Sequence, residues 1–303
     1  MVVFAAQGDA RRSLALLWRA ESPDEQRPGP RQALTVDEIV DAAVAVADEE
    51  GMAALSMRAV GQRLGRTGMA LYTYVPSKSE LVDLMYDRAH ASLSHDYPLD
   101  DRWRPAVVAW AGDLWRFYQR HPWVLQVSQV RPVLGPHEYA VVETVTRLLY
   151  ETGLPARTLT RVVGTLFHFV RGAAATVAEA TQAVTDTGVS NEDWWMTRSA
   201  LLTEVAPDFA DRYPTITRLG AEDTFTYDES KPYLEQQAQE TFEVGLGVIL
   251  DGVEAAMSRQ EPVTGGPPPA GSPAGGSRGA ARTAARGAPR TPRPIPRARP
   301  QDA

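Results

Sequence analysis

The chain has 303 residues, no cysteine and a formal net charge of -7, so it is long enough to bury a substantial core without disulfides or a structural metal. The lack of cysteine excludes disulfides, thiolate zinc sites and cysteine nucleophiles, and it fits the reducing cytoplasm. No apolar run reaches the roughly 18 residues that a membrane span needs, and so acidic a chain is not expected to coat nucleic acid with its whole surface.

Both ends of the chain are predicted to lack a packed core. Residues 1–32 carry one short amphipathic stretch, at 14–18, followed by several prolines, and are predicted to form a flexible arm. Residues 260–303 are mostly Pro, Gly, Ala, Ser and Arg, so conformational entropy is expected to keep this tail disordered. Because residues 262–303 hold seven arginines and one acid, a charge of +6, the preceding 261 residues carry -13.

Between these ends the apolar residues recur with helical spacing, and no convincing strand pattern occurs. Thr35 and Glu38 have the spacing of a capping box at the start of a first helix, which Gly51 is expected to end. Ser77 and Glu80 repeat the same pattern at the start of a later helix. The predicted fold is therefore all-α.

Two short helices are predicted between these two capping boxes. The first begins after Ser56 and ends at Gly65, and the second begins after Thr67 and must end before Pro76. With the helix predicted for residues 77–95, four helices fall within about sixty residues. Such a group is typical of a compact helix-turn-helix domain, which we place at residues 33–95.

This domain contains a stretch without acids. Between Gly51 and Ser79 the sequence has no Asp or Glu, yet it places Arg58, Arg63, Arg66 and Lys78 there. A basic surface of this kind on an acidic protein indicates a polyanionic partner, and double-stranded DNA is the leading hypothesis. The alternative is a helical subdomain whose Arg and Lys form an ordinary solvated face.

In a helix-turn-helix the second helix lies in the major groove, and its first turn reaches the base edges. Thr67, Gly68 and Met69 fall in that turn, and Tyr72 lies one turn further on. Lys78 is predicted to share a phosphate oxygen with the free N–H groups at the start of the next helix. We assign base or backbone contact to Arg58, which is long enough to cross the groove.

The run Leu71-Tyr72-Thr73-Tyr74-Val75 with Lys78, together with Ser56-x-Arg58 and the turn at Gly65, resembles the TetR/AcrR family of bacterial repressors over residues 33–95. The resemblance implies base contacts from Arg58, Thr67, Gly68 and Met69. It implies phosphate contacts from Tyr72, Tyr74 and Lys78, although Tyr74 stands where many members have His. It also implies that a larger domain for ligand binding and dimerisation follows, and that the protein represses transcription from a palindromic operator.

Residues 98–259 are predicted to form that larger helical domain. Its helices are expected at 102–120, 136–152, 155–183, 191–205, 207–218 and 232–258. The third and the last of these carry apolar stripes, which consist of Val162, Val163, Leu166, Phe167 and Val170, and of Phe242, Leu246, Ile249, Leu250 and Val253. We expect the 155–183 and 232–258 helices to form a four-helix interface in a homodimer; the alternative is that both stripes are ordinary core.

Aromatic residues are concentrated in this larger domain and could line a pocket for a small-molecule effector. The predicted ligand contacts are Trp110, Phe167, His168 and Arg171. A buried ion pair between Arg171 and Glu179 or Glu143 is the alternative for that arginine. The five histidines show no metal-ligand spacing, and neither a metal nor a cofactor is predicted.

The functional prediction from sequence is therefore a cytoplasmic DNA-binding regulator that a small molecule releases from its operator. The alternative from another class is an all-helical enzyme that uses the aromatic cavity for catalysis. That alternative has no paired carboxylates and no nucleophile with an adjacent base to support it.

Overall fold

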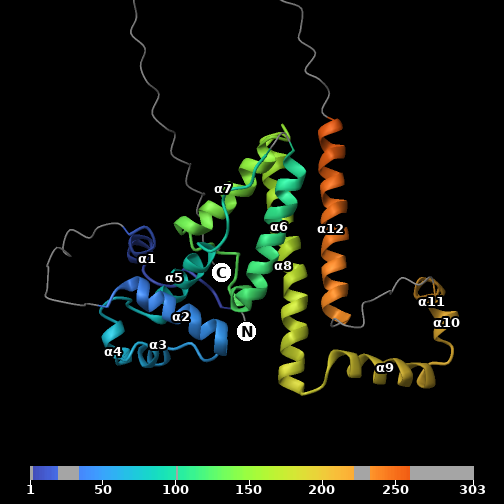
Figure 1. The fold of residues 1–303 in the computed structure, drawn as a ribbon, viewed down its shortest axis with the longest axis horizontal. Coiled ribbons are helices and arrows are strands. Elements are labelled where there is room, and N and C mark those ends of the chain that lie inside the picture. The colour runs from blue at the N-terminus through green and yellow to red at the C-terminus, as the bar shows by residue number, and fades with distance from the viewer. Residues whose placement is uncertain (1–2, 20–33, 100–101, 222–232, 260–303) are drawn as a thin grey trace, which may run out of the picture. The chain divides into compact units, whose positions relative to one another are not determined.

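The computed structural model describes residues 3–19, 34–99, 102–221 and 233–259 (Figure 1). Apart from one isolated β-bridge, these residues contain no strand, which confirms the predicted all-α fold. The helices are α1 (Ala10–Leu17), α2 (Val36–Glu50), α3 (Met57–Arg63), α4 (Gly68–Leu71), α5 (Lys78–His90), α6 (Trp103–Arg120), the 3-10 helix η1 (Pro122–Gln126), α7 (Pro136–Tyr150), α8 (Ala156–Thr187), α9 (Asn191–Val205), α10 (Phe209–Arg212), α11 (Pro214–Ala221) and α12 (Tyr233–Ser258).

Residues 34–95, which we call the reading head, contain helices α2 to α5. At the start of α2 the Thr35 hydroxyl accepts a hydrogen bond from the Glu38 N–H (3.1 Å), and the Glu38 carboxylate accepts one from the Thr35 N–H (2.8 Å). The capping box predicted at the start of α5 is only half formed, because the Glu80 carboxylate accepts from the Ser77 hydroxyl instead of the Ser77 N–H. Helix α5 also ends at His90, before its predicted end.

We call residues 97–259 the body. The reading head and the body share one continuous hydrophobic core. Helix α5 is central to this core, since every residue from Glu80 to Asp87 is buried. Leu71 of the head and Leu114 of the body are both fully buried members of the same cluster. The boundary predicted near residue 96 therefore separates two groups of helices that pack on each other.

The two stripes predicted to pair across a dimer are instead core of the single chain. Leu166 and Val170 of α8, and Leu246 and Leu250 of α12, are buried, and α8 packs against both α6 and α12. The prediction that these stripes form the dimer interface is wrong. Helical periodicity shows which side of a helix is covered, but it does not show whether the cover comes from the same chain.

Helices α9 to α11 have no buried residue. Their exposed large apolar side chains are Trp194, Trp195, Met196, Leu201, Leu202, Val205, Tyr213, Ile216 and Leu219. The single helix predicted at 207–218 is two helices, because Pro214 opens a new one after Tyr213. We call residues 190–221 the arm.

At the N-terminus, residues 1–32 were predicted to be flexible, but the described part of this segment, residues 3–19, packs on the rest of the chain. Residues 3–19 form a bridge to Val127, a helix that packs against α5, and a buried contact through Ala5 and Leu17. The prediction missed this because short apolar stretches reveal neither their partner nor its distance along the sequence. Residues 20–33 of that range, and the tail predicted to be disordered at 260–303, lie outside the described residues.

In the described ranges, none of the helices combines the length and the apolar character that crossing a membrane requires.

His90 is the most deeply buried titratable base near the junction of head and body. Its Nδ1 lies 2.7 Å from the Tyr86 carbonyl oxygen, and its ring packs against Tyr86 and Phe117. Burial lowers the pKa of His90 from 6.5 to about 4. The folded chain therefore resists protonation at this site.

We expect His90 to make folding stability sensitive to acid. As the pH falls below 6.5 the unfolded chain binds the proton first, so His90 alone should lower the free energy of unfolding by about 3 kcal/mol between pH 6.5 and 4. Because Asp83, whose pKa burial raises to about 6, acts in the opposite direction, the test compares urea denaturation of the natural chain with that of His90→Phe. Equal pH slopes for the two chains would contradict this assignment.

Candidate nucleic-acid interface

The crossing of α3 and α4 depends on two glycines. A Cβ on Gly61 would lie 2.9 Å from the Arg66 carbonyl oxygen and 3.0 Å from the Gly68 nitrogen. A Cβ on Gly68 would lie 3.1 Å from the backbone of α3. The turn between the helices contains Gly65 at φ +65°, a conformation that favours glycine. The sequence therefore fixes a close approach of the two helices.

The start of each helix is capped by a side chain. The Ser56 hydroxyl accepts from the Ala59 N–H (3.1 Å), and the Thr67 hydroxyl accepts from the Ala70 N–H (3.4 Å). Behind α4 the Leu71 side chain is fully buried, as predicted. These contacts hold α4 as a short helix whose opposite side is open to solvent.

The structure exposes most of the predicted contact residues on that open side. Met69 is 76% exposed and Tyr72 is 42% exposed, so both side chains are available to a partner. Arg58, Thr67 and Lys78 are exposed as well. Tyr74 is less accessible, because it is half-buried against the core.

Gly68, a predicted base contact, also allows α3 and α4 to approach each other closely. The missing side chain of Gly68 points toward the α3 backbone at Met57 and Arg58, so this residue allows the helices to pack. A larger residue would push α4 away from α3.

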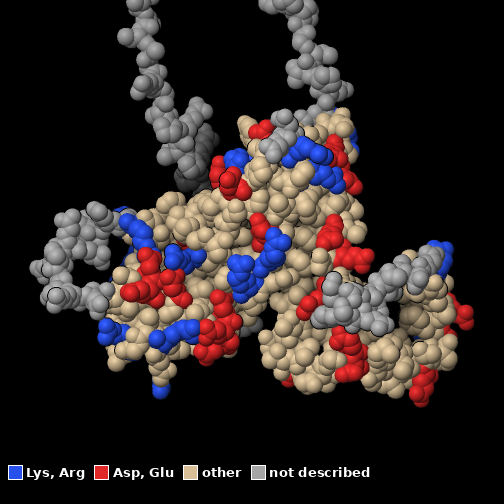
Figure 2. Space-filling view, in the orientation of Figure 1, with Lys and Arg blue, Asp and Glu red and all other residues tan. Residues whose placement is uncertain are grey.

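The charge on this surface is partly neutralised. Arg63 donates to both carboxylate oxygens of Glu49 (2.7 and 2.5 Å), and this bond lowers the pKa of Glu49. In the part of the chain that the structure describes, Arg58, Arg66 and Lys78 form no ion pair. Figure 2 shows Lys and Arg side chains along the α3–α4 edge of the head, with acidic side chains beside them.

Lys78 is the first residue of α5. The Ser77 hydroxyl accepts from the Ser79 N–H (3.0 Å) and the Glu80 N–H (3.5 Å), so it takes two of the N–H groups that were expected to be free for a phosphate. A phosphate contact here would therefore depend mainly on the Lys78 ammonium.

Models of two protein families match this chain. One, described as "Bacterial regulatory proteins, tetR family", matches residues 39–85, and the other, "Tetracyclin repressor-like, C-terminal domain", matches residues 97–257. The chain belongs to the TetR family of bacterial transcriptional regulators. The first match covers α3 and α4, which form the helix-turn-helix described above.

The similar proteins cover between 50% and 84% of this chain. The HTH-type transcriptional repressor DrrR1 of Streptomyces coeruleorubidus is 37% identical over 257 residues, which are 84% of this chain and 90% of DrrR1. The tetracycline repressor protein class D of Escherichia coli is 29% identical over 50% of this chain and 71% of its own. The Streptomyces coelicolor TetR family protein ActR, in a crystal structure with (S)-DNPA, has a TM-score of 0.56 and 25% identity over 74% of this chain and 99% of ActR. These proteins are regulators, and none is named as an enzyme.

Two carboxylates join the reading head of this TetR regulator to its body. Asp87 of α5 accepts from the His137 and Glu138 N–H groups at the start of α7 (2.9 Å each). A Cβ on Gly135 would lie 2.1 Å from Asp87 Oδ1, so glycine leaves room for this cap. Burial raises the pKa of Asp87, and the two N–H bonds oppose that rise.

The second carboxylate, Asp48, lies near the end of α2. Its Oδ1 is 2.8 Å from His121 Nδ1 and accepts from Trp123 Nε1 (2.7 Å). Neither carboxylate could be predicted from the sequence, because the partners of each lie 50 or more residues away along the chain.

The four predicted ligand contacts differ in their burial and in their partners. Trp110 is buried and meets Phe167 edge to face at 5.2 Å, while His168 is exposed. Arg171 donates to the carbonyl oxygens of Val124, Leu125 and Val127, with 3.1 Å to the last. Arg171 thus caps the end of η1, and the alternative ion pair with Glu143 or Glu179 is not formed.

Two cavities lie near the C-terminal end of α8, beyond His168 and Arg171. One, of about 380 Å³, lies between α6, α8 and α12, and its lining includes Trp115, Pro122, Thr181, Glu235 and Gln239. Trp115 belongs to the aromatic set noted in the sequence, but nothing in the sequence indicates that α12 faces it.

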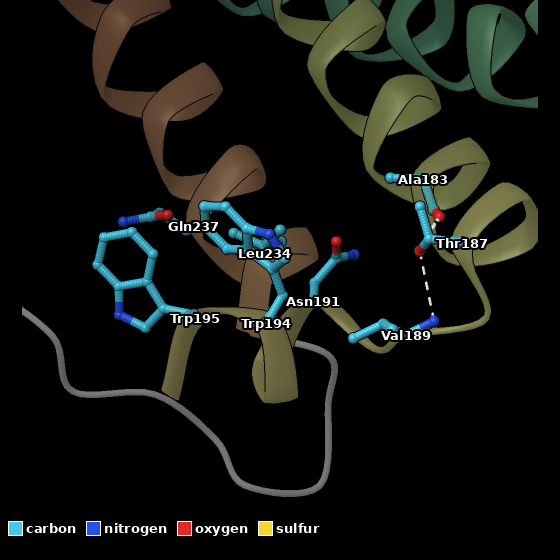
Figure 3. A pocket seen from close by; sticks show the side chains of 8 residues that line it. All are labelled: Ala183, Thr187, Val189, Asn191, Trp194, Trp195, Leu234 and Gln237. Carbon is cyan, nitrogen blue, oxygen red and sulfur yellow. Dashed lines mark hydrogen bonds between the residues drawn. The ribbon is translucent and has the colours of Figure 1, made fainter. Parts of the chain in front are cut away.

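A second cavity, of about 520 Å³, is shown in Figure 3. Trp194 and Trp195 of α9 lie on one side with Leu234 and Gln237 of α12, and Asn191 begins α9 beside them. None of the four predicted contacts lines either cavity. Among the described residues no group of His, Asp and Glu is arranged to hold a metal ion.

We expect Gly61→Ala to disturb the reading head. The added Cβ would meet two backbone atoms, so α4 must shift, and we expect a loss of about 1–3 kcal/mol in the free energy of unfolding together with weaker DNA binding. Gly112→Ala is the matched control. Nothing lies within 4 Å of the new Cβ in α6, and that variant should gain up to about 1 kcal/mol from helix propensity. Denaturation curves of the two variants check this, and equal effects would contradict it.

Proposed function

We propose that this TetR regulator is a cytoplasmic repressor that binds a palindromic operator as a homodimer and is released by a small molecule bound in its body. The observation that carries this proposal is the reading head. Its helix-turn-helix segment contains no Asp or Glu between Gly51 and Ser79, it exposes Met69 and Tyr72, and its Arg58 and Lys78 form no ion pair within the described residues. The similarity to proteins named as repressors supports the direction of regulation.

Residue roles follow from the position of each side chain. Thr67 and Met69, on the first turn of α4, would face base edges, and Arg58 would reach a guanine edge or the backbone. Tyr72 and Lys78 would hold phosphates and fix the register of α4 in the groove. The half-buried Tyr74 would contribute through its hydroxyl only.

A homodimer is required because two half-sites about one helical turn apart, roughly 34 to 36 Å, need two heads held by a twofold axis. The outward side of α12 offers a surface for it. Val244 and Val248 are 63% and 66% exposed, one turn apart, and Gly252 and Ala255 continue this side as small residues.

The outward side of α8 adds to this surface and is also exposed, with Thr165, Gly172 and Thr176 along it. We therefore retain α8 and α12 as the dimer helices, but assign the interface to their outward sides. The exposed apolar side chains of the arm would add to the buried area.

For the effector we favour the cavity between α6, α8 and α12. One of its walls is Trp115, which stacks on Phe242 with ring centroids 4.9 Å apart. The Trp115 indole N–H is buried and has no acceptor in the described chain, so an effector oxygen would satisfy it. The TetR protein ActR has been crystallised with (S)-DNPA, which supports a small organic molecule as the ligand class.

Selection of bound duplexes from a random DNA pool tests the function directly. We expect the selected sequences to contain two inverted half-sites with a fixed separation, because the dimer presents two identical heads. Recovery of no duplex, or of sequences with no symmetry, would overturn the proposal.

We expect Lys78→Ala to weaken binding to all duplexes and to reduce the slope of log K against log salt by about 0.9 for each lost phosphate contact. Changes at Thr67 or Met69 should instead alter the preferred base. The control is Arg157→Ala, which removes an exposed charge at the start of α8 in the body. Titrations at several salt concentrations measure the slope. A changed base preference with an unchanged slope for Lys78→Ala would show that its role is misassigned.

We expect Val248→Glu to dissociate the dimer, because it would bury two like charges near a twofold axis. Val142→Glu places the same substitution at a partly exposed position of α7, outside the proposed interface, and should leave the dimer intact. Light scattering after size exclusion gives the mass of each species. A dimeric Val248→Glu variant would remove this side of α12 from the interface.

A further inference from the structure

Residues 3–19, which we call the strap, run between body and head. At the body end, Val3 pairs with the segment after η1. Its N–H donates to the Gln126 carbonyl oxygen, and its own carbonyl oxygen accepts from the Ser128 N–H (2.8 Å each). Three residues on, the Ala6 N–H donates to Asp83 Oδ1 of α5 (2.8 Å). Within four residues the strap thus bonds to both the body and the central helix of the head.

The second half of the strap repeats this bridging. Helix α1 packs against α5, and Leu17 is buried at its end. The Trp18 indole N–H donates to the Leu134 carbonyl oxygen of the body (2.9 Å), and the Trp18 ring lies 6.3 Å from that of Tyr139 in α7. Arg19 forms an ion pair with Asp37 of α2 in the head.

We propose that the strap fixes the angle of the reading head on the body and thereby sets the separation of the two heads in the dimer. This inference rests on the proposed function, because head separation matters only where two heads bind one operator. The joints at Asp48 and Asp87 attach the head at α2 and α5. The strap adds attachments at Asp83 and Asp37, further along the same two helices toward their N-terminal ends, and so opposes rotation of the head.

Two features of the docked strap favour its release. Ala6 adopts φ +55°, a left-handed conformation that is strained for a residue with a side chain. Asp83 is buried by the strap and α5, its Oδ2 has no partner within the described residues, and Glu80 is close enough to repel it. Gly8 allows this approach, since a Cβ there would overlap the Glu80 carboxylate. Undocking would relieve the Ala6 backbone and return Asp83 to water.

Leu17→Asp tests the strap because it places a charge where α1 meets α5, while Leu14→Asp places the same charge on the 38%-exposed side of α1. Binding is measured to a duplex selected from the random pool and to a duplex that carries one of its half-sites. For Leu17→Asp we expect at least about tenfold weaker binding to the full site, because fewer dimers hold both heads at the required separation. Binding to the half-site should be unchanged, and Leu14→Asp should match the natural chain on both duplexes.

Equal losses on the two duplexes, or no loss for Leu17→Asp, would overturn the role of the strap. Failure of the natural chain to bind any selected duplex would instead overturn the proposed function.

A second measurement tests the role of the strap independently of the proposed function. Because the chain has no cysteine, spin labels can be placed at Gln62→Cys of the head and Glu143→Cys of the body, both exposed.

The distance distribution between these labels should broaden when residues 2–19 are deleted, and circular dichroism should show that the helices of head and body remain. This readout needs neither DNA nor effector. An unchanged distribution in a folded deletion variant would show that the strap does not position the head.

Discussion

The attachment of a small head to a large body is the constraint on which this regulator depends, because a four-residue helix can present its side chains to DNA only if that helix is held in place. Two carboxylates, one buried and one partly buried, attach the head to the body. Asp87 substitutes for the missing N-cap of α7, where Gly135 has no side chain to cap the helix. Asp48 holds η1 through His121 and Trp123. Each bond joins a carboxylate to N–H donors across two helices, so loss of either partner would leave a buried polar group unpaired.

The features of the reading head that the sequence predicts correctly are those that involve residues close together in the chain. Thr35, Ser56 and Thr67 each cap the helix that the sequence assigned to them, because a cap involves groups only three residues apart. The same holds for the exposure of Met69 and the burial of Leu71, since side chains on a short helix alternate between a packed and an open side within one turn. The reading head therefore followed from the sequence almost completely.

The body was less predictable because its decisive contacts are distant in sequence. The stripe on α8 that includes Leu166 was correctly recognised as buried, but its cover is α6 and α12 of the same chain. Arg171 looked like a ligand contact because an arginine in an apolar segment needs a partner. Its partners are backbone carbonyls some 44 to 47 residues earlier, which have no signature in the sequence. Neither cavity could be located without knowing where α12 returns against α8.

These long-range contacts place the proposed effector cavity next to the joints of the head. Pro122 lines the cavity and also opens η1, whose next residue, Trp123, donates to Asp48. Arg171 holds the other end of η1 to α8. A ligand alters DNA binding only if it favours one arrangement of the head over another. Helix η1 is fixed to α8 on one side and to α2 on the other, so it cannot move without changing one of these attachments. An effector that displaced Pro122 would therefore favour a different arrangement of the head.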